Sequence, residues 1–102
     1  MEVIFEYKGV KASNLLEEKT LKKLNKLAVK YSFVVRAIVF FKTELTHSYS
    51  PTSGKICTIR LSVPGPLLFA ESNKGDLESA MLDVIHELES QLSKKKGKML
   101  SH

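Results

Sequence analysis

Hydrophobic and polar positions alternate with two different periods along this chain, and the changes of period divide it into successive elements. Residues 2–8 alternate apolar with charged side chains, which is typical of a strand with one buried face. Between Ser13 and Lys30 the apolar residues recur every three or four positions, which predicts an amphipathic helix capped by Ser13 or Asn14. The predicted apolar side of this helix contains Leu21, Leu24, Leu27, Ala28 and Tyr31.

Three more strands and a second helix are predicted after it. Residues 33–41 are apolar at nearly every position and rich in β-branched side chains, which favours a central strand. The polar stretch 43–55 predicts a long hairpin loop. Strands are expected at 56–63 and 67–72, and a helix at 77–95. The apolar side of this second helix is predicted to contain Leu77, Ala80, Met81, Val84, Leu88 and Leu92.

The predicted order, β-α-β-β-β-α, belongs to the α+β class and gives a four-stranded sheet with two helices packed on one face. A right-handed crossover places the first helix on one face. The second helix covers the same face most economically, which leaves the other face partly open to water. The length predicts one domain, residues 1–102, with an ordered core to about residue 95 and a basic tail at 96–102. In the third strand we expect Cys57, Ile59, Leu61 and Val63 to face inward and Thr58, Arg60 and Ser62 to face outward.

The net charge of +5 favours an acidic partner, and the cations are clustered. Between Lys19 and Lys42 there is no acidic residue. Like charges one helical turn apart repel by about 0.2–0.5 kcal/mol per pair, so selection for stability alone would intersperse acids. The cluster on the first helix therefore favours a binding surface over a solvated face. We call it the lysine band, and it consists of Lys19, Lys22, Lys23, Lys26 and Lys30.

A second basic cluster lies in the sequence QLSKKKGK at residues 91–98. Cations also suit the C-terminus of a helix, so this cluster alone is a weaker sign of binding. Because both helices are predicted on the same face of the sheet, the two clusters can form one surface matched to a double-stranded or folded RNA backbone. No aromatic motif for reading single-stranded bases is present, so we expect contacts with RNA shape and phosphates.

Enzymatic and metal-binding chemistry is not predicted. The glycines are scattered, and His86-Glu87 is not followed by a second histidine because position 90 is serine. We expect Cys57 to be a small core residue, and a single cysteine suits a reducing compartment. No apolar run approaches the roughly 20 residues of a membrane span. The sequence therefore predicts a cytoplasmic protein with no cofactor, no membrane association and no small-molecule substrate.

Taken together, these elements resemble the ribosome hibernation-promoting factors, also called ribosome-associated inhibitors. The resemblance covers nearly the whole chain and rests on the element order and on three segments: KKLNKL at 22–27, PGPLLFAESNKGDLESA at 64–80 and LESQLSKKKGK at 88–98. It implies a double-stranded-RNA-binding-like fold that docks on the small ribosomal subunit. There it would occupy the channel used by mRNA and tRNA, block translation and protect idle ribosomes.

The resemblance also implies which residues contact rRNA. To the lysine band it adds a set at the end of the second helix, namely Gln91, Lys94, Lys95, Lys96 and Lys98. This chain departs from the family pattern at Glu78 and Leu82, where the family has an aromatic and an acidic residue, and in its long 43–55 loop. It ends without the dimerisation domain of long family members, so pairing of ribosomes would require a separate dimerisation partner.

Two alternatives remain open at this point. The first is an RNA- or protein-binding module of the same fold unrelated to hibernation, which would use the open face of the sheet around Arg36, Thr58 and Arg60. The second is a small enzyme, which would need a pocket with paired titratable groups, and the sequence nominates none.

Overall fold

The computed structural model describes residues 1–43 and 54–100, with the side chain of residue 100 excepted. The strands form one sheet in the order β1-β2-β3-β4, in which β1 pairs parallel with β2 and the other neighbours pair antiparallel. The predicted order β-α-β-β-β-α and the α+β class are confirmed. The elements are β1 (Glu2–Lys8), α1 (Asn14–Lys30), β2 (Arg36–Thr43), β3 (Lys55–Ser62), β4 (Leu68–Lys74) and α2 (Leu77–Leu100).

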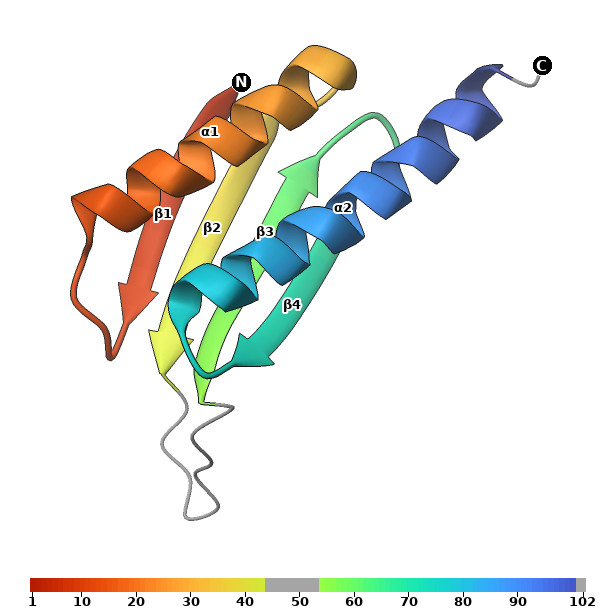
Figure 1. Ribbon diagram of the computed structural model, residues 1–102. Coiled ribbons are helices and arrows are strands. Elements are labelled where there is room, and N and C mark those ends of the chain that lie inside the picture. The colour runs from red at the N-terminus through yellow and green to blue at the C-terminus, as the bar shows by residue number, and fades with distance from the viewer. Residues whose placement is uncertain (44–53, 101–102) are drawn as a thin grey trace.

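Both helices cover the same face of the sheet and run side by side in the same direction (Figure 1). Inward side chains of the strands meet the apolar sides of the helices and form one core, in which full burial of each leucine contributes about 1.5–3 kcal/mol. Cys57 lies in this core with no exposed surface, as predicted. Other core residues include Leu24, Leu27, Val39, Phe41, Ile59, Leu61, Met81, Val84, Leu88 and Leu92.

Two element boundaries differ from the prediction by more than two residues, each for a local reason. The strand β2 begins at Arg36 rather than at residue 33, because the Val34 N–H donates to the Tyr31 carbonyl (3.1 Å) and closes a turn after α1. The helix α2 ends at Leu100 rather than at residue 95, because lysine is a good helix former and the lone Gly97 costs only about 1 kcal/mol relative to alanine. Residues 96–100 are therefore helix rather than a separate tail.

The outer face of the sheet is open but not flat. Thr58 and Arg60 line it as predicted, together with Ile38, Phe40 and Phe69, around a hollow of about 300 Å³. Thr58 is nevertheless only 9% exposed. Its hydroxyl donates to a carboxylate oxygen of Glu71 on the neighbouring strand (2.9 Å). A polar side chain on the outer face of the sheet is therefore not necessarily exposed to solvent. Residues 44–53 of the predicted 43–55 loop lie outside the described residues.

Candidate nucleic-acid interface

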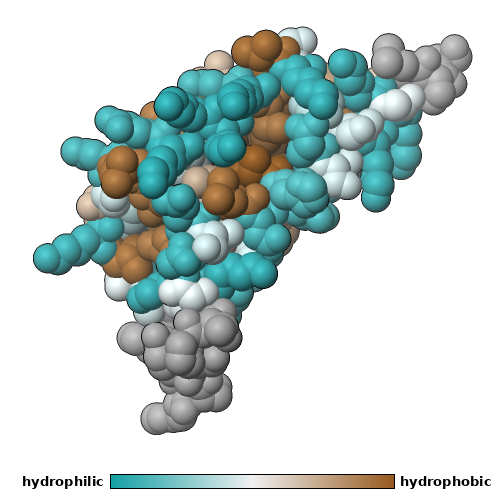
Figure 2. Space-filling model, viewed as in Figure 1, coloured by the Kyte–Doolittle hydropathy of each residue, from teal (hydrophilic) through white to brown (hydrophobic). Residues whose placement is uncertain are grey.

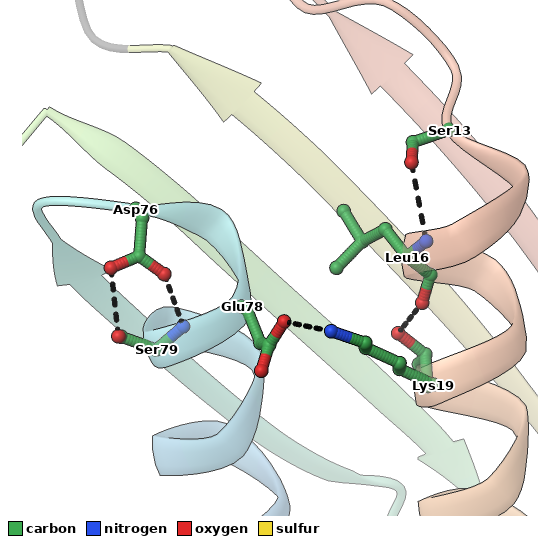
Figure 3. Close-up of polar contacts among 7 residues, drawn as sticks. Ser13, Leu16, Lys19, Asp76, Glu78 and Ser79 are labelled. Carbon is green, nitrogen blue, oxygen red and sulfur yellow. Dashed lines mark hydrogen bonds and ion pairs between the residues drawn. The ribbon is translucent and has the colours of Figure 1, made fainter.

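The helix α1 is fixed at its first turn by local hydrogen bonds. The Ser13 hydroxyl accepts from the Leu16 N–H (3.2 Å; Figure 3), which confirms Ser13 as the N-cap. The Thr20 hydroxyl donates to the Leu16 carbonyl (2.7 Å). Leu24 and Leu27 are buried against the sheet, and this orientation turns the lysine band outward. All five lysines of the band are exposed.

Two lysines of the band are ion-paired with α2. The Lys19 ammonium lies 2.6 Å from Glu78 (Figure 3), and the Lys30 ammonium lies 2.8 Å from Glu89. Both pairs join residues 59 positions apart, as expected for parallel helices in constant register. The hydrogen bond with Glu89 raises the pKa of Lys30, and the same bond lowers the pKa of Glu89. Both pairs are largely exposed, so each contributes little to stability.

Between these two ion pairs the lysine band is unneutralised. Lys22, Lys23 and Lys26 make no ion pair with any residue that the structure describes. Next to them, a hollow of about 330 Å³ between the helices has an apolar side formed by Leu82 and Ile85. Figure 2 shows this hydrophobic surface between the helices, bordered by hydrophilic side chains. The central lysines are therefore the cations of the band that can meet an anionic ligand without first breaking an ion pair.

The two basic clusters meet at Tyr31. The Lys30 ammonium lies 5.5 Å and the Lys96 ammonium 5.6 Å from the centroid of the Tyr31 ring, both within cation–π range. The Tyr31 hydroxyl donates to Glu89 (3.0 Å), and the ring is 2% exposed. From the sequence, Tyr31 was expected only to be an apolar core residue. Its position directly after Lys30, at the end of the helix, was the available signal that it could join the clusters.

Other residues at the end of α2 point in different directions. The side chain of Lys95 extends toward the β3–β4 turn, with its ammonium 3.4 Å from the position that a Cβ on Gly65 would occupy. Gln91 donates from its side-chain amide to the Phe69 carbonyl (2.9 Å) and to Glu87 (3.3 Å), which places it over β4. The structure therefore brings Lys96 to the lysine band and leaves Gln91 and Lys95 on the β4 side of α2. Lys94 and Lys98 are exposed.

The first turn of α2 is also capped. Asp76 accepts from the Ser79 N–H and from the Ser79 hydroxyl, both at 2.8 Å (Figure 3), and the backbone bond lowers the pKa of Asp76.

In the described ranges 1–43 and 54–100, no group of three or more His, Cys, Asp or Glu side chains could hold a metal ion. Across the same ranges, no helix is both long and apolar enough to traverse a membrane.

A four-stranded sheet covered on one face by two parallel helices, with lysines along those helices, defines a small α+β domain with a basic helical face. The family model of the sigma 54 modulation protein / S30EA ribosomal protein matches residues 3–100. The chain belongs to this family, and the family resemblance seen in the sequence is confirmed.

Solved structures share the fold. A ribosomal subunit interface protein from Coxiella burnetii is 26% identical, with a TM-score of 0.79, and the match covers 95% of this chain and 99% of that chain. The Protein Y N-terminal domain from Thermus thermophilus is 20% identical, with a TM-score of 0.74 over 92% of this chain and 98% of that one. The second likeness shows the fold alone. No curated protein sequence matches the chain.

Proposed function

We propose that this protein binds the small ribosomal subunit through the lysine band and the end of α2, and that it inhibits translation by occupying the mRNA and tRNA channel of idle ribosomes. Membership of the S30EA ribosomal protein family supports a ribosomal partner, as does the likeness to the ribosomal subunit interface protein from Coxiella burnetii. The observation that carries the proposal is the meeting of Lys30 and Lys96 at Tyr31, because it makes one basic surface from two helices.

The mechanism follows from occupancy and charge. Lysine ammonium groups bind phosphates and release counterions, so affinity falls as the salt concentration rises. Lys22, Lys23 and Lys26 supply such charges without breaking an ion pair, and Lys96 extends the surface beyond the end of α1. Binding blocks the channel sterically, and no covalent bond is made or broken.

Co-sedimentation with ribosomal subunits tests the proposal. We expect the wild-type protein to travel with the small subunit at about 50 mM salt and to dissociate steeply by about 200 mM, as phosphate contacts require. The double variant Lys23→Glu with Lys26→Glu should lose this association and keep its fold, because both side chains are exposed.

The matched control is Lys8→Glu with Lys11→Glu. It makes the same change in net charge at two exposed lysines that lie outside both helices. The control should still sediment with the small subunit. Retained binding by the band variant would refute the proposed surface. Equal loss by both variants would show a dependence on net charge alone. If binding to the small subunit instead required Arg36 and Arg60, the protein would be a module that binds through the open face of its sheet.

A further inference from the structure

The strand β4 ends the sheet, and the side to which each of its backbone groups points can be assigned. In an antiparallel sheet, the N–H and C=O of alternate residues point to opposite sides of a strand. The Ser62 carbonyl accepts from the Val35 N–H, so Ser62 directs its backbone groups toward β2. By alternation, Cys57, Ile59 and Leu61 direct theirs toward β4, where they pair with Ser72, Ala70 and Leu68.

The remaining residues of β4 therefore direct their backbone groups away from the sheet. A second hydrogen bond agrees with this assignment, because the Phe69 carbonyl accepts from the Gln91 side chain rather than from β3. The N–H and C=O of Glu71 point to the same outer side, where no further strand of the described chain is present. Such an edge is a template for another extended segment.

A hollow of about 440 Å³ runs beside this edge, between β4 and α2. From α2 it is lined by Asp83, His86, Glu87 and Gln91, and from β4 by residues 69–71. Its charge is opposite to that of the protein as a whole, because the carboxylates of Asp83 and Glu87 line it from α2 on a chain with a net charge of +5. Lys74 is 3.9 Å from Asp83 and compensates it only in part. The hollow repels RNA and attracts a cationic ligand.

We propose that this edge binds an extended, basic segment of a protein partner, which adds to the sheet as a fifth strand beside β4. Main-chain hydrogen bonds to β4 supply affinity in this mode, and alternate side chains supply specificity. One set of partner side chains meets the carboxylates of Asp83 and Glu87, so it consists of lysine or arginine. The other set lies on the outer face beside Phe69, which is 47% exposed, so it is apolar. The partner segment therefore alternates basic with apolar residues.

The same charges argue against a second copy of this chain as the occupant. Two β4 strands paired edge to edge would bring the carboxylates of Glu71, Asp83 and Glu87 toward those of the other copy, and like charges facing across paired strands are destabilising. The proposal goes beyond the ribosome-binding function and is independent of it, since the lysine band lies on α1 and this edge lies on the far side of α2 (Figure 1).

The test uses an acetylated and amidated octapeptide in which lysine alternates with valine, titrated into the ¹⁵N-labelled full chain. We expect saturable shifts in the amide signals of β4 and of the adjoining face of α2. A peptide with glutamate in place of lysine should not bind. The decisive variants are Glu71→Pro and Glu71→Ala, which both remove the carboxylate, while only proline removes the outward N–H. Proline is tolerated at such an edge position, so the fold should persist.

We expect the proline variant to bind the lysine peptide about fivefold more weakly than the alanine variant, as the loss of one hydrogen bond predicts. Glu87→Lys provides a second readout that does not depend on tolerance of proline. It should weaken binding of the lysine peptide and permit binding of the glutamate peptide. Equal affinities of the proline and alanine variants, or shifts confined to the outer sheet face, would overturn strand addition. Self-association through β4 in place of peptide binding would overturn the choice of partner.

Discussion

Lys19 and Lys23 are equivalent in the sequence pattern but not in the structure, and this difference can be measured. Glu78 neutralises Lys19 at 2.6 Å, whereas Lys23 makes no ion pair with a described residue. We therefore expect Lys23→Gln to weaken small-subunit binding strongly and Lys19→Gln to weaken it little. The variant Glu78→Gln should strengthen binding, because it releases the Lys19 ammonium for a phosphate contact.

The expected changes in binding affinity follow from counterion release. Each phosphate contact contributes about 0.9 to the slope of log K against log salt, so loss of one contact weakens binding about eightfold at 0.1 M salt. Lys23→Gln should show this loss. For Lys19→Gln we expect a change of about twofold, because a charge without a direct contact acts only through a screened field with a Debye length of about 10 Å. Glu78→Gln should gain up to about eightfold, with a steeper salt slope.

The assay is equilibrium binding of each variant to purified small subunits between 50 and 300 mM salt, over which the Debye length falls about 2.4-fold. Urea unfolding of each variant serves as the control, since an exposed ion pair contributes only about 0–1 kcal/mol. Equal losses for Lys19→Gln and Lys23→Gln, with no gain for Glu78→Gln, would refute the reasoning. That outcome would mean that the ion pair does not limit the availability of Lys19.

Two further predictions concern titratable groups. Burial raises the pKa of Cys57 to about 12, so iodoacetamide should label its thiol at pH 8 only in urea; rapid labelling of the folded protein would contradict this. The Lys30–Glu89 bond lowers the pKa of Glu89 below 4.5 and raises that of Lys30 above 10.5. Its stabilisation is therefore fully present between these pH values, and it is lost as pH falls through the lowered pKa or rises through the raised one. The difference in unfolding free energy between wild type and Glu89→Gln should shrink outside this pH window. A difference that does not change with pH would argue against a stabilising Lys30–Glu89 bond.

Periodicity was sufficient to predict the element order and the side of the third strand that enters the core. Cys57, Ile59 and Leu61 face inward, as their alternation indicates, because a period of two leaves a strand only one way to bury its apolar side chains. The ends of elements were less predictable. The turn after α1 depends on a hydrogen bond between Val34 and Tyr31, and an apolar sequence does not reveal it.

The exposure of the lysine band was predictable from the sequence, and its ion pairing was not. The lysine band is exposed on one side of α1, as its spacing of three and four indicates. Its neutralisation by Glu78 and Glu89 depends on the register between two helices that are far apart in sequence, which no local pattern specifies. For the same reason the sequence grouped Gln91 with the lysines, although its amide contacts β4.

The length of α2 has a consequence for local unfolding. Its 24 residues span about 36 Å, whereas the seven residues of β4 beside it span about 23 Å. Leu92 is the last core residue of the helix, so the turns after it depend on helix propensity and on the long side chains of Lys95 and Lys96 rather than on apolar packing. Gly97 weakens that propensity further. The last turns can therefore open and close at little cost while the core stays folded, and the lysines on them can adjust to a phosphate backbone without straining the sheet.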